Sequence, residues 1–490
     1  MNPSATEAAL QGGKPFSIKP LIPVLFSLIA GMLLVMLDNT IMNVAIPELE
    51  NVFHTSLKTI QWAITGYTLA TSMIIPLAGW FSDRFTAKRV FLVSILLFTV
   101  GSLLCAAAQS PAQLIVFRIM QGLGGGMVAP IGMALSFKIA PPERRGELMG
   151  FLAMPMLIAP LLGPVLSGWL LEYVSWHWIF LINLPIGLIA IYLGMKYLPV
   201  SDKGASAKLD IWGMILSPLA FSSLVFGVHR GGAEGWTDFY TLLPLTFGLV
   251  ALSLFIVVEL RQKEPLLELR SFRSFEFTKG IILVWINQIA LFGSILLIPL
   301  YLQQVRGFSS FESGMMIIPQ ALVSFAGVMA GGRLLDKYGA RIPVFSGLVL
   351  LSAALVLLSR LDSDTTIYAM IGSFALLGLG QGLTTMQLGT HVLKSAPKDL
   401  ISRVTPLTTS AQQIVGSFAI AIISGLLSSN IAEHMSQASS ASAYAHTAAM
   451  VAGFHDTFLL PLSLALCGVV LSLFLRKQEH GSGSTEAGSE

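Results

Sequence analysis

The sequence has few charged residues and only two cysteines. Charged residues make up 11% of the 490 positions, against about 25% in a soluble domain. Cys105 and Cys467 lie in apolar segments far apart in the chain, so they indicate neither a disulfide framework nor a metal site. The first 20 residues lack the apolar run of a cleavable signal peptide, and no Gly-Lys-Ser/Thr phosphate-binding motif occurs. These absences argue against a globular enzyme and against ATP as an energy source.

Long apolar runs take the place of charge. Hydrophobic residues make up 54% of the chain, in runs that are separated by polar turns. A run of about 20 apolar residues spans a bilayer as a helix. The sequence therefore predicts an all-α polytopic membrane protein with fourteen transmembrane helices. Their cores lie at residues 21–46, 60–80, 90–108, 112–137, 148–171, 178–198, 210–229, 239–259, 277–301, 312–332, 342–360, 367–392, 404–430 and 457–475.

The basic residues test this helix count independently, because lysine and arginine stay on the cytoplasmic side. With the N-terminus inside, 24 of the 29 lysine and arginine residues fall in cytoplasmic segments. The exceptions are Lys58, Arg230, Arg306 and Arg360 in outside segments and Arg118 within the membrane. Both termini are therefore predicted to be cytoplasmic. Since topology accounts for the bases, the net charge of +3 indicates no nucleic-acid partner.

Two polar stretches lie outside the predicted spans. The outer segment 431–456 is rich in alanine and serine and contains His434, His446 and His455. These histidines match no compact metal-ligand spacing, so we expect a flexible, solvated loop without a metal. Residues 476–490 have the Gly/Ser-rich composition of a disordered cytoplasmic tail.

A short motif occurs twice, each time at the cytoplasmic end of a predicted helix. In both copies a glycine precedes an aspartate by four residues, one base follows at once, and another stands five positions after the aspartate. The residues are Gly79, Asp83, Arg84, Lys88 and Arg89 in the first copy and Gly332, Asp336, Lys337, Gly339 and Arg341 in the second. Two ordinary turns could produce this, but the shared spacing at equivalent positions favours an internal duplication.

The duplication predicts how the chain is divided. We expect a cytoplasmic tail at 1–20, a six-helix bundle at 21–198, two inserted helices with linkers at 199–276, a second six-helix bundle at 277–475 and the tail at 476–490. Two parallel-related bundles around a central site are typical of alternating-access transporters. The motif aspartate can accept hydrogen bonds from a helix N-terminus or pair with an arginine, which would latch the cytoplasmic side closed. Gating is therefore predicted for Gly79, Asp83, Arg84, Arg89, Asp336 and Arg341.

One acid, Asp38, lies inside an apolar span. A carboxylate at the centre of a membrane helix costs at least about 2.5–3.5 kcal/mol, so chains keep one mainly for proton relays, ion pathways or cationic ligands. The alternative is a permanent structural pair with a buried base. That alternative predicts misfolding, and not uncoupling, when Asp38 is neutralised.

These segments resemble the major facilitator superfamily, and in particular its fourteen-helix drug:proton antiporter branch. Besides the two cytoplasmic motifs, similar stretches lie at residues 37–47 (with Asp38, Thr40, Asn43 and Pro47), 118–126, 159–168 and 176–187. Thr86 and Ser167 stand where that family usually has glycine. The resemblance covers residues 20–475 and implies a multi-pass protein of a bacterial inner membrane, driven by the proton gradient without a cofactor. It also implies that Arg118 takes part in proton transfer.

The depths of Asp38 and Arg118 in the membrane are similar. At a rise of 1.5 Å per residue, Asp38 lies about 13 Å and Arg118 about 10 Å from the outer ends of their helices. We expect the two to be coupled, directly or through water or Gln121. Protonated Asp38 would then release a cationic substrate and ionised Asp38 would bind it.

Other polar residues in the spans are candidates for a substrate cavity. They are Asn39, Asn43, Gln61, Tyr67, Gln121, Asn287, Gln288 and Gln412. For any single amide among them, hydrogen bonding between helices is at least as good an explanation. In the fifth helix, Pro160, Gly163, Pro164 and Gly168 predict a bend and a close-packed seal that acts in gating.

The sequence thus predicts proton-coupled export of lipophilic cationic compounds, with small lipophilic substrates, protons and membrane lipids as partners. A transporter of the same fold for one endogenous cargo (a lipid, siderophore, amino acid or metabolite) is the alternative, because only one clear acid lies in the membrane. An intramembrane enzyme would need a nucleophile–base set or metal ligands, and a fixed channel disagrees with the gate motifs. In a Gram-negative source, a periplasmic adaptor would be a further partner.

Overall fold

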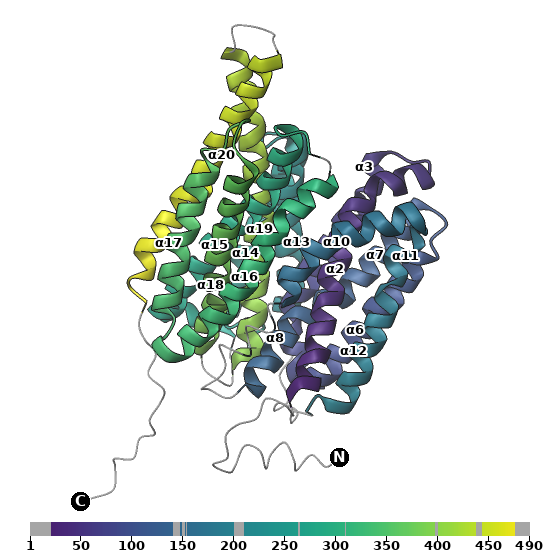
Figure 1. Cartoon of the computed structure of the whole chain (residues 1–490). Coiled ribbons are helices and arrows are strands. Elements are labelled where there is room, and N and C mark those ends of the chain that lie inside the picture. Colours follow the sequence, from purple (N-terminus) through teal and green to yellow (C-terminus); the bar gives the residue numbers. More distant parts are fainter. Residues whose placement is uncertain are drawn as a thin grey trace, which may run out of the picture.

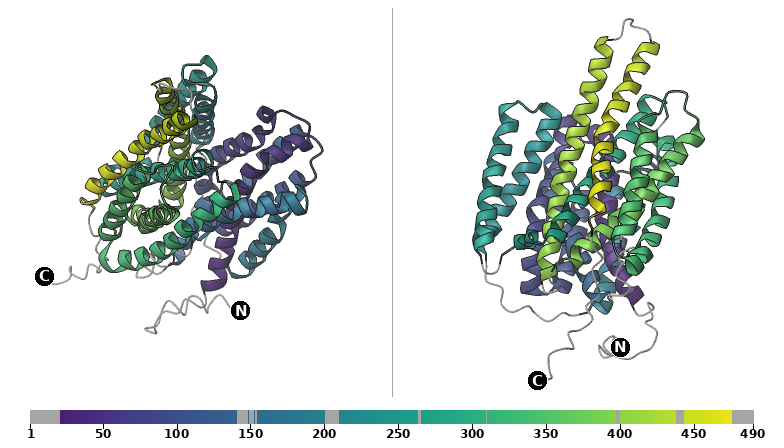
Figure 2. Two further views of the ribbon diagram at one scale, coloured as in Figure 1. Left: turned by 45° about the horizontal axis from the view of Figure 1, so that its top comes forward. Right: turned by 90° about the vertical axis from the view of Figure 1, so that its left-hand side faces the viewer.

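The computed structural model is a bundle of long helices (Figures 1 and 2). It describes residues 21–140, 148, 152, 154–199, 210–262, 265–308, 310–396, 400–437 and 443–475, and no strand occurs among them. Within these residues, thirteen helices are long and apolar enough to cross a membrane. A further helix, α10, takes the place of the fifth predicted span. The predicted all-α polytopic fold is confirmed.

The N-terminal half contains three spans that are built from consecutive helical pieces. Its elements are α2 (Ile22–Val52), α3 (Leu57–Ile60), α4 (Trp62–Ile74), η2 (Ile75–Leu77), α5 (Ala78–Phe85), α6 (Ala87–Ala106), α7 (Pro111–Gly125), α8 (Val128–Ile139), α10 (Met154–Tyr173), α11 (His177–Leu181) and α12 (Asn183–Tyr197). The second span joins α4, η2 and α5, the fourth joins α7 and α8, and the sixth joins α11 and α12. Pro76 is the central residue of the short 3₁₀ turn within the second span, where its missing N–H interrupts the α-helical hydrogen bonding.

Two inserted helices and six further spans follow. The elements are α13 (Ile211–Glu234), α14 (Phe239–Arg261), η4 (Leu269–Arg273), α15 (Phe275–Gln304), α16 (Ser310–Tyr338), α17 (Arg341–Leu358), α18 (Ile367–Lys394), α19 (Ile401–Gln437) and α20 (Ala443–Ser472). In Figure 1 the N-terminal half, coloured purple to blue, lies beside the C-terminal half, coloured green to yellow. The helix α2 begins and α20 ends at the same end of the bundle, as expected if both termini lie on one side of the membrane.

The outer segment 431–456 differs from the expected flexible loop. Helix α19 continues to Gln437 and α20 begins at Ala443, so the two helices extend well beyond the rest of the bundle (Figure 1). His434 contacts Asp456 at 2.7 Å, and Asn430 donates to Thr457 at 3.1 Å. The prediction was wrong because small polar residues suit an exposed helix as well as a loop, and alanine is the strongest helix former.

The two copies of the cytoplasmic motif share one unusual backbone conformation. Gly339 has φ 80° and Thr86 has φ 77°, and each lies three residues after the motif aspartate. A positive φ favours glycine, yet Thr86 adopts it and caps α6 by accepting from the N–H of Arg89. The backbone at Thr86 therefore has a φ like that at Gly339 despite the missing glycine. It supports the internal duplication.

Candidate functional site

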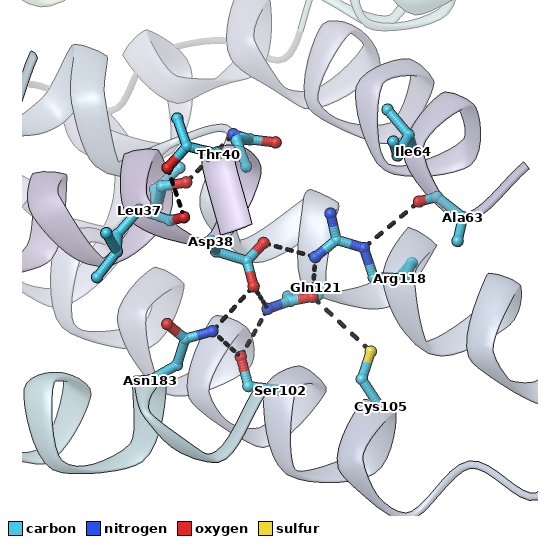
Figure 3. A network of polar contacts seen from close by, with 12 residues as sticks. Leu37, Asp38, Thr40, Ala63, Ile64, Ser102, Cys105, Arg118, Gln121 and Asn183 are labelled. Carbon is cyan, nitrogen blue, oxygen red and sulfur yellow. Dashed lines mark hydrogen bonds and ion pairs between the residues drawn. The ribbon is translucent and has the colours of Figure 1, made fainter. Parts of the chain in front are cut away.

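An ion pair lies inside the N-terminal half (Figure 3). Asp38 lies on α2 and Arg118 on α7, and Nη1 of Arg118 donates to Oδ2 of Asp38 over 2.5 Å. The two residues are 1% and 0% exposed. The predicted pairing of Asp38 with Arg118 is confirmed, and the contact is direct.

Three neutral side chains complete the network around Asp38. Gln121 accepts from Nη1 of Arg118 at 2.7 Å through Oε1 and donates to Oδ1 of Asp38 at 3.0 Å through Nε2. Asn183, the first residue of α12, donates to the same Oδ1 at 2.8 Å. Ser102 on α6 accepts from both amides, at 2.6 Å from Gln121 and 3.1 Å from Asn183. Four helices of the N-terminal half thus meet at one carboxylate (Figure 3).

Arg118 has two more contacts, both on α4. Its Nε donates to the carbonyl of Ala63 at 3.4 Å, and its guanidinium carbon lies 4.3 Å from the ring centroid of Tyr67. A guanidinium over an aromatic face gains a cation–π attraction that is strongest where water is excluded. Arg118 is therefore held from several sides and not only by its charge partner.

The surroundings of the pair are apolar. Buried Leu37, Ile41, Cys105 and Phe180 pack in the same cluster. In such a low-dielectric site the two charges interact strongly, and removing one partner leaves the other charge uncompensated. With Asp38 and Arg118 fully enclosed, no water reaches the carboxylate in this conformation. A change in its protonation state therefore requires a rearrangement of the network.

Helix α10 packs closely against α2 next to this site. The hydroxyl of Thr40 donates to the carbonyl of Ala159 at 3.0 Å, and that of Ser167 donates to the carbonyl of Ile41 at 3.1 Å. A Cβ placed on Gly163 would lie 2.1 Å from Oγ1 of Thr40, so only glycine fits there without a shift. A Cβ on Gly168 would meet nothing within 4 Å. The side chains of Pro160 and Pro164, where we expect a bend, lie outside the described residues.

A second charged contact joins the two halves at their cytoplasmic end. Nε of Arg403, at the start of α19, donates to Oδ2 of Asp83 at the end of α5 over 3.2 Å. Asp83 thus meets an arginine, as the motif chemistry predicts. We call this contact the cytoplasmic latch.

The other predicted gating residues lie around this end. Arg84, Arg89 and Arg341 are exposed, Gly79 is buried, and Asp336 is half-buried near the end of α16. Lys88 has the more specific role in the first motif, because its Nζ donates to the carbonyls of Met195 and Leu198. It thereby caps the C-terminal end of α12.

The predicted cavity residues are spread over both halves. Tyr67 and Gln121 belong to the Asp38 network, and Asn39 donates to the carbonyl of Val35 on its own helix at 3.1 Å. Gln61 is exposed at the start of α4, and Gln288 and Gln412 are half-buried. The side chain of Asn43 lies outside the described residues.

Asn287 bridges two helices of the C-terminal half. It accepts from Thr384 at 2.7 Å and donates to Thr385 at 3.0 Å, and so links α15 to α18. In the described part of the chain, no group of three or more His, Cys, Asp or Glu side chains is arranged to hold a metal ion.

Sequence reasoning missed Asn183, Ser102 and Arg403 as site residues. Asn183 lies in the 176–187 stretch that carries part of the family resemblance, and this was an available signal. Ser102 had no signal, because serines are common in membrane helices and bond their own backbone. Arg403 was recognised only as a cytoplasmic base, since its partner lies 320 positions away in the sequence.

The fold and this site define a multi-pass membrane transporter built from two helical halves with inserted helices between them. The chain belongs to the Major Facilitator Superfamily, whose sequence pattern it matches over residues 28–421. The family predicted from the motifs is confirmed. Its members are transporters and not enzymes.

Relatives and solved structures agree with this assignment. The multidrug resistance protein B homolog of Mycobacterium tuberculosis is 36% identical over 394 residues, which cover 80% of this chain and 73% of that protein. The lincomycin resistance protein LmrB of Listeria monocytogenes is 31% identical over 462 residues, covering 94% and 98%. The human organic anion transporter MFSD10 (TETRAN) has a similar structure, with a TM-score of 0.61 over 92% of this chain and 100% of that one. At 14% identity, this last likeness shows the fold alone.

Proposed function

We propose that this chain is a proton-coupled exporter of lipophilic cationic compounds in a bacterial inner membrane. The observation that carries the proposal is the enclosed Asp38–Arg118 pair within an apolar cluster. Such a pair is costly to bury and is weak evidence for a purely stabilising role. Relatives named for multidrug and lincomycin resistance support the export of drug-like compounds. The proton gradient would supply the energy, with no further cofactor.

Electrostatics gives the exchange of proton for substrate a simple basis. With Asp38 ionised, the pair carries no net charge and a cation can lie nearby. With Asp38 protonated, the charge of Arg118 is uncompensated and repels the cation. At about 8 Å and an effective dielectric constant of about 20, that repulsion is about 2 kcal/mol, or about a 30-fold loss of affinity. Proton binding and substrate binding therefore oppose each other.

The cytoplasmic latch gives the alternating-access part of the proposal. The Asp83–Arg403 contact joins the two halves and would hold the cytoplasmic end closed, and Gly163 packs closely on Thr40 between α10 and α2. Opening towards the cytoplasm would break the latch. Loading from the cytoplasm, or from lipid at that end, would follow.

Proton release from acid-loaded proteoliposomes, on addition of tetraphenylphosphonium, tests the proposal. We expect the wild type to release protons and Asp38→Asn, reconstituted at equal folded yield, to release none. Glu259→Gln is the matched control, because it also neutralises a buried acid of a membrane helix but lies in the inserted pair. It should behave as the wild type.

Two outcomes contradict the proposal in different ways. Unchanged proton flux in Asp38→Asn would mean that Asp38 has only a structural role. No flux from the wild type with any lipophilic cation would favour the alternative, a transporter of one endogenous cargo. A single enclosed charge pair in the N-terminal half is compatible with that narrower function.

A further inference from the structure

We propose that Asn183 is a positioning residue that responds to the protonation state of Asp38 by turning its side-chain amide over. The inference rests on the proposed proton coupling at Asp38. It is carried by a difference among the three side chains that donate to this carboxylate: Arg118, Gln121 and Asn183. Only one of the three can change from donor to acceptor.

Arg118 and Gln121 are fixed as donors. A guanidinium has no acceptor, so Arg118 can only donate to Oδ2 of Asp38. Gln121 could in principle turn over, but its Oε1 already accepts from Nη1 of Arg118 at 2.7 Å. Turning it would set an N–H against an N–H and lose a charge-assisted hydrogen bond. Its Nε2 therefore stays directed at Asp38.

Asn183 has no such restraint. Its Nδ2 donates to Oδ1 of Asp38 at 2.8 Å and to the hydroxyl oxygen of Ser102 at 3.1 Å. Its Oδ1 is buried and has no hydrogen-bond partner among the residues that the structure describes. A buried acceptor without a donor is costly, so this orientation of the amide is maintained by the ionised state of Asp38. An unused acceptor lies on the opposite side of the same planar group.

Protonation of Asp38 would favour the opposite orientation of the Asn183 amide. Oδ2 faces the fixed donor Arg118 at 2.5 Å, so the new O–H bond forms on Oδ1. A half-turn of the Asn183 amide then brings its Oδ1 to accept this O–H, and the hydroxyl of Ser102, which can donate or accept, turns to donate to it. The proton stays on Asp38, and the amide keeps nearly the same shape. The amide atom of Asn183 that faces Asp38 and Ser102 is thus hydrogen-bonded in both states.

Asn183 links the Asp38 network to the break in the sixth span. Asn183 begins α12 directly after Ile182, where the sixth span breaks into α11 and α12. Its contact with Asp38 joins α12 to α2. A second buried hydrogen bond joins the same two helices, from the hydroxyl of Ser27 to the carbonyl of Ala190 at 2.9 Å. This second bond has no contact with Asp38 and provides a matched control.

Infrared difference spectroscopy between low and high pH, on protein with ¹³C-labelled asparagine carboxamides, observes the turn directly. We expect one asparagine carbonyl band to move to lower frequency at low pH, because its oxygen gains an O–H donor. Its midpoint should equal that of the protonated-carboxyl band of Asp38, and both changes should vanish in Asp38→Asn. An asparagine spectrum that stays constant while Asp38 titrates would overturn the proposal. This measurement needs no Asn183 variant to fold.

The pH profile of proton-coupled flux gives the functional test. Asn183→Leu removes a charge-assisted hydrogen bond from the ionised state and only a neutral one from the protonated state. We expect its half-maximal pH to rise by about one unit, a tenfold change. Ser27→Ala, which removes only an α2–α12 hydrogen bond, should leave the half-maximal pH where it is.

The failures of this inference and of the proposed function can be told apart. Equal half-maximal pH in Asn183→Leu and Ser27→Ala, with flux still abolished by Asp38→Asn, would overturn the role of Asn183 alone. Absence of substrate-evoked proton flux in the wild type would overturn both.

Discussion

Neutralising Asp38 and Arg118 singly and together tests how strongly the two charges depend on each other. Asp38→Asn leaves the guanidinium of a fully buried arginine without its carboxylate, and Arg118→Gln leaves the carboxylate without its cation. Breaking a buried pair in this way costs about 3–5 kcal/mol. The double variant removes both charges and keeps amides of similar size, so it should cost only about 1–2 kcal/mol of imperfect hydrogen bonding. The coupling energy is therefore expected to be at least about 4 kcal/mol.

Unfolding free energies from denaturant titration in mixed micelles, followed by tryptophan fluorescence and circular dichroism, measure this cycle. The double variant should be more stable than either single variant, although under the proposed function it should not couple transport to protons. Additive losses, with the double variant the least stable of the set, would refute the reasoning. They would mean that Ala63, Tyr67 and Gln121 already compensate the guanidinium.

Three further predictions concern the cytoplasmic latch, the backbone conformation at Thr86 and the packing of α10 on α2 at Gly163. Asp83→Asn should favour cytoplasm-open conformations about fivefold, since a partly buried pair contributes about 1 kcal/mol; spin-label distances between α5 and α19 measure this, and unchanged distances would contradict it. Thr86→Gly should raise the free energy of unfolding by about 1 kcal/mol, because relief of the positive φ outweighs the lost helix cap and the entropy of glycine. Thermal unfolding measures this, and a lower melting temperature than that of the wild type would contradict the prediction. Gly163→Ala should lower the free energy of unfolding by about 1–3 kcal/mol, because the new Cβ collides with Thr40. Gly168→Ala is the control without such a neighbour, and equal losses in both would refute the packing argument.

The helix count was predictable because the thickness of a bilayer fixes the length of an apolar run. The sidedness was predicted from the basic residues, and the paired ends of α2 and α20 are consistent with it. The extension of α19 and α20 could not be predicted from composition, because alanine and serine occur in both loops and exposed helices. The contacts of His434 with Asp456 and of Asn430 with Thr457 depend on two segments lying side by side.

The candidate site was predictable only along the membrane normal. Helical rise gives the depth of Asp38 and Arg118, and their similar depth predicts the pair that the structure contains. Depth does not say which face of a helix points inward, so Asn183 and Ser102 could not be distinguished from other polar residues. Their place depends on how α12 and α6 are rotated towards α2, and this is decided by the packing of the whole half.

Among the described residues, the distribution of ion pairs suits the proposed movement of the two halves. The Asp38 network uses α2, α6, α7 and α12, and Arg118 also contacts α4, so all of its members belong to the N-terminal half. Of the ion pairs formed between described residues, only Asp83–Arg403 joins this half to the C-terminal one. Relative motion of the two halves can therefore leave the enclosed network, where a broken contact costs several kcal/mol, intact. In the proposed opening, the described ion pair that would break is partly exposed and contributes about 1 kcal/mol. Under the proposed proton coupling, protonation of Asp38 is the change that occurs inside the network. Asn183 would meet it, because the Oδ1 of its amide has no hydrogen-bond partner among the described residues.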